Sequence, residues 1–129
     1  MQPEWPRIAG RIPTWLVLPS GVGRRRRVLI AEERVRHIAE RRPSEAEFCL
    51  VNMAVVLQEP FWLGHRRSDH RGRVELVRPV GPHGRLLLVG VKFLDEEAEA
   101  WVSTAYPWSL LALTRRLRNG TMWEVGRGS

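Results

Sequence analysis

Hydrophobic residues change their spacing twice in the first half of this chain, and each change predicts a different local structure. The segment 12–18 (IPTWLVL) is a short apolar run closed by the turn-forming sequence PSGVG, which indicates a strand or an extended arm. Residues 28–30 look extended, and apolar side chains then recur at helical spacing near 32–42 until Pro43 ends the pattern. The chain is therefore expected to form a short amphipathic helix that carries His37.

A second helix is predicted directly after the first. Ser44 and Glu47 have the spacing of a capping box, and the residues from there to 58 are almost all apolar. A helix that is apolar on every side is buried. We therefore expect the segment 45–58 to be the central helix of the core.

The second half of the chain has the pattern of strands. Three segments are expected to be strands: 74–80, 85–94 and 100–106. Turn signals at Pro82 and Gly84, and again at 95–97, separate them, which predicts an antiparallel meander. The segment 108–118 predicts a closing helix that Asn119 and Gly120 stop. Helices followed by consecutive strands indicate an α+β fold, with N-terminal helices packed on an antiparallel sheet.

The chain length fits one folded unit. With 129 residues, 43% of them hydrophobic and 27% charged, the composition is typical of one globular domain. The expected organisation is an N-terminal arm or strand at 1–26, a single α+β domain at 27–118 and a C-terminal tail at 119–129. No apolar run has the length of a signal peptide core or a membrane span, so the expected location is the cytoplasm, with no membrane partner.

The charge and the cysteine content narrow the classes of partner and site. A net charge of +7 favours a polyanionic partner, with nucleic acid and anionic membrane surfaces as the candidates. The single cysteine, Cys49, excludes an internal disulfide and a cysteine-based zinc site. Only one of the 21 lysine and arginine residues, Lys92, is a lysine. A GC-rich genome also encodes arginine in preference to lysine, so the excess of arginine alone does not establish a function.

Lys92 lies within an apolar, strand-like run. Residues two apart on a strand share a face, so Gly90 and Lys92 point the same way. If the hairpin pairs even positions with even positions, Lys92, Thr104 and Tyr106 share one surface, and Gly90 leaves room for a ligand. The alternatives are a gatekeeper lysine that prevents edge pairing or aggregation, ordinary strand propensity at Thr104 and Tyr106, and a solvated helix position for His37.

Four segments in a fixed order carry a family resemblance: VLIAEERVRHIAERRP, LQEPFWLG, VGVKFLD and WVSTAYP. They resemble the phage-associated branch of the barnase-EndoU-colicin-RelE superfamily of small ribonucleases, over roughly 27–107. The resemblance implies an RNase-like fold, in which two helices pack on a four-stranded antiparallel sheet, and RNA cleavage without a metal or other cofactor. It matches the catalytic pattern of that superfamily at His37, Lys92, Thr104 and Tyr106. The chain departs from the pattern at Arg42, where RRP stands in place of His-Pro.

The chemistry of RNA transesterification suits these residue types. The reaction needs a base for the 2′-hydroxyl, an acid for the leaving 5′-oxygen and donors for the charge that builds on the phosphorane. A histidine, whose unperturbed pKa lies near 6.5, can move protons, and a lysine ammonium can stabilise charge. One histidine leaves one proton-transfer role empty. His65, His70 and Glu75 are the candidates for it.

The basic loop GHRRSDHRGR is expected to contact phosphate groups. The predicted substrate-binding residues are Arg42, His65, Arg66, Arg67, His70, Arg71 and Arg73. A metal site at His65, Asp69 and His70 is not favoured, because the arginines would repel a divalent ion and no further ligand has a recognisable spacing. A plain solvated loop is an alternative.

The sequence therefore predicts a metal-independent endoribonuclease, a phage- or toxin-system effector whose partners are RNA and, as a further candidate, a cognate inhibitor protein. The alternative is a basic nucleic-acid-binding or protein-interaction domain that keeps the RNase fold without catalysis. The arginine at position 42 motivates that alternative.

Overall fold

The structure, a computed structural model, describes residues 4–18, 26–65, 72–93 and 99–125. Within these ranges the chain forms three helices and one seven-stranded sheet. The strands are β1 (Arg7–Arg11), β2 (Arg27–Ile30), β3 (Trp62–Gly64), β4 (Arg73–Val80), β5 (Arg85–Phe93), β6 (Ala100–Trp108) and β7 (Met122–Glu124). The helices are α1 (Glu32–Arg41), α2 (Ala46–Gln58) and α3 (Leu110–Arg118). The predicted α+β class is confirmed.

The sheet has the strand order β1-β2-β6-β5-β4-β3-β7. Its centre is the antiparallel meander of β4, β5 and β6, which confirms the three strands expected there. The β4–β5 turn falls at Gly81 and Gly84, both with positive φ (75° and 63°), a conformation that glycine adopts without strain. The meander supplies the long strands on which the candidate site is built.

The sheet is larger and less uniform than the sequence predicted. It has seven strands in the described residues, where the resemblance implied four, and β2 pairs with β6 in parallel. The helices are also not the first elements, because β1 and β2 precede them. A parallel neighbour needs a crossover connection, and the segment carrying α1 and α2 follows β2 here. The first strand lies at Arg7–Arg11, just before the expected segment 12–18, from which Ile12 and Leu16 enter the core.

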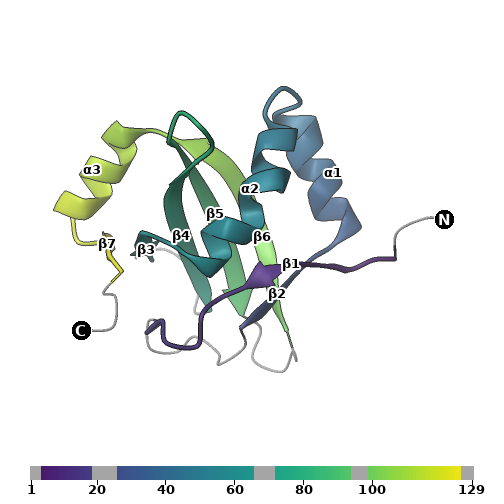
Figure 1. Ribbon diagram of the computed structural model, residues 1–129, viewed down its shortest axis with the longest axis horizontal. Helices are drawn as coiled ribbons and strands as arrows, with labels where there is room; N and C mark the ends of the chain where they lie inside the picture. Colours follow the sequence, from purple (N-terminus) through teal and green to yellow (C-terminus); the bar gives the residue numbers. More distant parts are fainter. Residues whose placement is uncertain (1–3, 19–25, 66–71, 94–98, 126–129) are drawn as a thin grey trace.

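Helices α1 and α2 cover one face of the sheet and α3 lies by the other, on opposite sides of the central strands in Figure 1. The covered face packs against α2 through a cluster that includes Cys49, Met53, Val56 and Leu57. The strands contribute the odd-numbered positions of β5, such as Val89, to this cluster. The expected core helix is confirmed, but it is buried on one face only, because Val51 is 71% exposed.

The capping box predicted for α2 is wrong. The helix begins at Ala46 behind Glu45, and no side chain caps its first turn. The Glu45 carboxylate instead forms ion pairs with Arg85 and, at 3.7 Å, with Arg42. Tertiary charge pairing thus replaces the local cap that Ser44 and Glu47 suggested.

Helix α3 begins two residues later than predicted, because β6 continues to Trp108. Ser109 caps it by accepting a hydrogen bond from the backbone N–H of Ala112 at 3.1 Å. Its end at Asn119 and Gly120 agrees with the prediction. Leu113 anchors the helix in a second apolar cluster with Val77, Leu88 and Met122. None of the helices in the described ranges is long and apolar enough to cross a membrane.

Candidate functional site

The β5–β6 hairpin contains a bulge that sets the direction of the candidate residues. Leu88 opposes Tyr106 and Gly90 opposes Thr104, but Val91 then opposes Val102, so Ser103 is an extra residue in β6. Beyond the bulge Lys92 opposes Trp101. Because Lys92 and Gly90 are two apart on one strand, Lys92, Thr104 and Tyr106 still share a face. This confirms the predicted shared face, although even positions pair with even ones only as far as Gly90.

A hollow of about 250 Å³ lies at the outer edge of β6. We call it the edge hollow; its lining residues are His37, Ile38, Arg41, Arg42, Thr104, Ala105 and Tyr106. It can form because β2 pairs with β6 only at Ala100 and Trp101, which leaves the rest of that edge beside α1. The Arg42 guanidinium lies 5.6 Å from the centre of the Tyr106 ring. Three of the four predicted catalytic residues therefore meet here, together with Arg42.

A second hollow, of about 160 Å³, adjoins the first on the face of the sheet. We call it the face hollow; its lining residues are Arg73, Val74, Glu75, Gly90, Ser103, Thr104 and Tyr106. The absence of a side chain at Gly90 keeps it open, because a Cβ there would lie 2.8 Å from Thr104 Cγ2 and 3.0 Å from Ser103 Oγ. Thr104 and Tyr106 line both hollows and form the wall between them.

Glu75 is a buried carboxylate at the face hollow. Arg116 of α3 donates a hydrogen bond to Glu75 Oε1 at 2.6 Å, and both side chains are nearly buried, with 12% of Arg116 and 10% of Glu75 exposed. Arg116 also donates to Thr121 Oγ1 at 2.5 Å and to the Thr121 carbonyl at 3.1 Å. The carboxylate is thus fixed in place by a cation that is itself held at several points.

The three candidates for the second proton-transfer group have different positions. Glu75 lines the face hollow, next to Thr104 and Tyr106. His65 follows β3, where its backbone N–H bonds the Thr121 carbonyl, and it is not among the described residues that line either hollow. His70 lies outside the described residues. Of the two described candidates, Glu75 is the one that the fold brings to the site.

Lys92 occupies the middle of the sheet, not its edge. Strand β5 is hydrogen-bonded to β4 on one side and β6 on the other, so protection of a free edge does not explain this lysine. Lys92 is half-buried, and it is not among the described residues that line the two hollows. It stands two residues, roughly 7 Å, along the strand from Gly90. Lys92 therefore lies beside the face hollow, at the next position after Gly90 on this face of β5.

The predicted phosphate-binding residues are only partly described. Arg42 lines the edge hollow and Arg73 lines the face hollow. Four of the set lie outside the described residues: Arg66, Arg67, His70 and Arg71. Asp69, like His70 a candidate ligand of the disfavoured metal site, also lies outside the described residues. The part of the chain that is described holds no group of three metal-ligating side chains.

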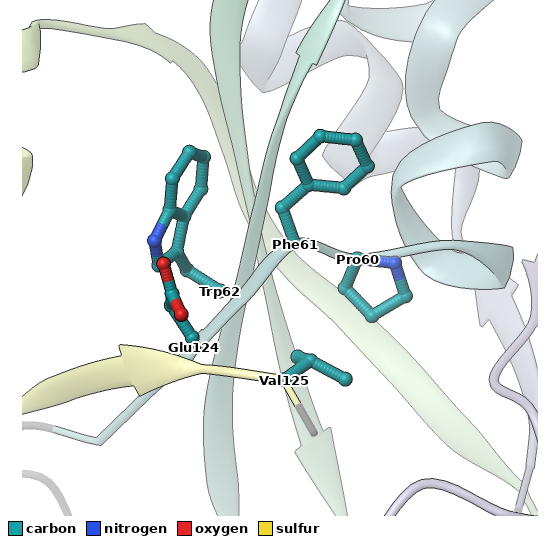
Figure 2. A pocket seen from close by; sticks show the side chains of 5 residues that line it. All are labelled: Pro60, Phe61, Trp62, Glu124 and Val125. Atoms are coloured by element: carbon teal, nitrogen blue, oxygen red, sulfur yellow. The ribbon is translucent and has the colours of Figure 1, made fainter. Parts of the chain in front are cut away.

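A third hollow, of about 380 Å³, lies where β3 and β7 pair, away from β6 across β5 and β4. Figure 2 shows Pro60, Phe61, Trp62, Glu124 and Val125 around it. Trp62 and Glu124 are directly opposed across the two strands. This hollow offers aromatic surface and one carboxylate, without a histidine or a cation among its described lining residues, so it suits general acid–base chemistry less than the other two.

Sequence reasoning missed Ser103, Arg41 and Arg116. Ser103 reaches the face hollow only because of the bulge, and Arg116 reaches Glu75 across 41 positions in the chain. No local sequence pattern signals either arrangement. Arg41 could have been found, because it lies one turn from His37 on the same helix face.

Comparison of the chain with protein-family models, with curated proteins and with solved structures finds no match.

Proposed function

We propose that this protein is a metal-independent endoribonuclease that cleaves RNA by transesterification, as its resemblance to the barnase-EndoU-colicin-RelE superfamily implies. One observation carries the proposal: His37 from α1, Arg42 directly after α1, and Thr104 and Tyr106 from β6 line a single hollow. A titratable imidazole, a guanidinium, a hydroxyl and a phenol are the groups that bind a phosphodiester and move protons beside it.

The proton transfers are assigned to the two sides of the Thr104–Tyr106 wall. A phosphate over this wall has His37 on the side of the edge hollow and Glu75 on the side of the face hollow. Glu75 accepts the proton of the attacking 2′-hydroxyl, and His37 in its charged form donates a proton to the leaving 5′-oxygen. His37 is exposed and accessible to substrate. This assignment fills the role that the arginine at position 42 left empty.

Charge on the phosphorane is stabilised by fixed donors. Arg42 reaches the wall through its position over the Tyr106 ring. The Thr104 hydroxyl and the Tyr106 phenol donate to phosphate oxygens, and Lys92 adds an ammonium near Gly90. An arginine has a planar fork where lysine has a point charge on a slim stem, so Lys92→Arg is expected to lose most of the cleavage although the charge is kept.

The second candidate function is nucleic-acid binding without cleavage, by a basic domain that retains this fold. Two observations favour it: Arg42 stands where the family pattern has a histidine, and Glu75 is already paired with Arg116. An effector role in a phage or toxin system, with a cognate inhibitor protein, belongs to the first proposal. A protein-interaction role belongs to the second.

The decisive experiment incubates purified protein with labelled RNA in EDTA. We expect cleavage that leaves a cyclic phosphate end and no cleavage of DNA, which lacks the attacking 2′-hydroxyl. His37→Ala should lower the rate about 10²- to 10⁴-fold with RNA affinity unchanged, because proton transfer contributes to the rate and not to binding. His83→Ala, at an exposed histidine in the β4–β5 turn, is the matched control and should cleave normally.

Two outcomes would contradict the enzyme proposal. Full cleavage by His37→Ala would remove the proton-transfer assignment. Wild-type protein that binds RNA in a salt-dependent manner and cleaves none of several RNAs would establish the binding function instead.

A further inference from the structure

A row of directly opposed residues crosses five strands on the face of the sheet that carries Gly90 and Thr104. From one edge inward its members are Ile8, Leu29, Trp101, Lys92 and Arg73. We call it the cross-strand row. The face on which these side chains lie follows from their neighbours in the sequence. Those neighbours belong to the apolar cluster under α2 and so point to the opposite face: Val28, Val91, Val102 and Val74.

One half of the cross-strand row is cationic. Lys92 and Arg73 are directly opposed on β5 and β4, and like charges in that position destabilise a sheet. Neither side chain forms an ion pair with another described residue. Arg73 also lines the face hollow. An anion bound between the two cations would remove their repulsion, which makes this half of the row a phosphate position.

The other half of the row is apolar and includes an indole. Trp101 is half-buried and stands next to Lys92. Leu29 beyond it is 9% exposed, and Ile8 at the sheet edge is 56% exposed. An aromatic side chain beside a cation on an open strand surface is a stacking platform for a nucleobase whose phosphate is held by the cation.

The row is separate from the part of this face that α3 occupies. The apolar cluster around Leu113 of α3 includes Leu86 and Leu88 of β5, whereas Lys92 lies beyond Gly90 toward the opposite end of that strand. Trp101 likewise lies at the start of β6, away from Tyr106 and Trp108, which pack on that cluster. The row therefore lies beside the Thr104 end of the proposed cleavage position, two residues along β5 from Gly90.

We propose that the cross-strand row is a nucleotide subsite for single-stranded RNA, in which a base stacks on Trp101 and its phosphate binds between Lys92 and Arg73. This inference rests on the proposed function for the identity of the polymer, and it names where the chain next to the scissile phosphate lies. Charge complementarity and the aromatic platform select single-stranded nucleic acid over a polyanion without bases. In a duplex the base faces are stacked on one another and unavailable to Trp101.

The test measures binding of a fluorescent, uncleavable 2′-O-methyl single-stranded RNA by anisotropy over a range of salt concentrations. Trp101→Leu should raise the Kd about 5- to 150-fold, the range expected for loss of one stacked base, and should leave the salt dependence nearly unchanged. Lys92→Gln and Arg73→Gln should also raise the Kd. Each of them should reduce the slope of log K against log salt concentration by up to about 0.7, the value for one phosphate contact on a single strand.

Matched controls come from elsewhere in the same chain. Trp123→Leu removes an exposed tryptophan of β7, which opposes Leu63 of the α2-side cluster and so lies on the other face. Arg118→Gln removes an exposed arginine of α3. Both should bind RNA as the wild type does. Trp101→Phe should retain most of the affinity because it keeps an aromatic face, and circular dichroism on each variant establishes that the sheet is intact.

Inorganic polyphosphate separates stacking from charge. Trp101→Leu should bind polyphosphate normally while Lys92→Gln binds it weakly. Equal loss of RNA and polyphosphate binding in Trp101→Leu, or affinities of the row variants equal to those of the Trp123 and Arg118 controls, would overturn the subsite.

The experiments also distinguish failure of the subsite from failure of the proposed function. If the row variants lose RNA binding while the wild type cleaves no RNA, the subsite stands and the chain is a binding domain. If His37→Ala abolishes cleavage while Trp101→Leu and Arg73→Gln bind and cleave RNA normally, the enzyme stands and the subsite is wrong.

Discussion

The two ends of one sheet face differ although the same strands form both. At the α3 end, β4 and β5 place Val77, Leu86 and Leu88 against Leu113, and all four are buried. At the other end the same strands place Glu75, Arg73 and Gly90 around the face hollow, and Lys92 lies two residues beyond Gly90 on β5. The change from apolar to polar takes place between two neighbouring positions on this face of β5, Leu88 and Gly90.

Stability and the proposed function therefore depend on different positions along these strands. Burial of apolar side chains contributes about 1.5 to 3 kcal/mol for each fully buried Leu or Val, so the α3 end contributes to the stability of the fold. The polar end has little apolar surface to bury and a pair of opposed cations that opposes folding. The proposed nucleotide subsite would account for this unfavourable pair.

The largest expected effect comes from the ion pair that joins the two ends. Arg116→Met removes the cation that Arg116 supplies to the buried Glu75 carboxylate, which should lower the free energy of unfolding by about 3 to 5 kcal/mol in urea titrations near pH 7. Arg118→Met on the same helix should change it by less than about 0.5 kcal/mol, because that residue is exposed. Similar stabilities for the two variants would mean that the pair does not couple α3 to the polar end.

The next effect compares a residue from each end directly. Leu88→Ala, at a fully buried position, should cost about 2 to 5 kcal/mol of unfolding free energy. Thr104→Val replaces the hydroxyl of a residue that lines both hollows with a methyl group, so it should cost less than about 1 kcal/mol in the same titration while RNA cleavage falls. A strongly destabilised Thr104→Val protein would show that the polar end is structural.

A smaller effect tests the space at Gly90. Gly90→Ala places a Cβ 2.8 Å from Thr104 Cγ2 and 3.0 Å from Ser103 Oγ, and overpacking of this kind typically costs about 1 to 3 kcal/mol. The added methyl also fills the face hollow, so RNA cleavage should fall. In the double variant Gly90→Ala/Ser103→Ala, thermal unfolding should recover part of the lost stability, because one of the two close contacts is removed. No recovery would mean that Thr104 alone limits the space.

The smallest effect concerns the opposite, α2-covered face. Burial raises the pKa of the Cys49 thiol above its usual range, and Glu45 adds to the rise while Arg42 and Arg85 oppose it. The folded state therefore keeps the thiol proton to higher pH than the unfolded state does. This contribution to stability is fully present below the unfolded pKa of about 8.5 and is lost as pH rises toward the folded value, by at most about 1.4 kcal/mol per pH unit.

The measurement for Cys49 is the free energy of unfolding at pH 7 and at pH 10 in the wild type and in Cys49→Ala. The wild type should lose more stability over this interval than the variant, which has no thiol to titrate. Equal losses in the two proteins would assign the pH dependence to other groups.

Local periodicity predicted much of the secondary structure, because helices and hairpin turns depend on neighbours in the chain. The segments near 32–42, 45–58 and 85–94 were placed within about two residues, and the lone lysine was correctly placed on a strand. The shared face of Lys92, Thr104 and Tyr106 also followed from alternation along the strands. The roles of these residues in catalysis stay predictions, as does the superfamily.

What the sequence by itself determined is therefore which segments are helices or strands and which side chains alternate on each. The tertiary structure alone decided that β1 and β2 join the sheet beside β6, that Ser103 forms a bulge opposite the Gly90–Val91 step, and that Arg116 pairs with Glu75. These features depend on packing between residues far apart in the chain. Local patterns carry no information on which distant strand becomes a neighbour, or on where two paired strands shift register.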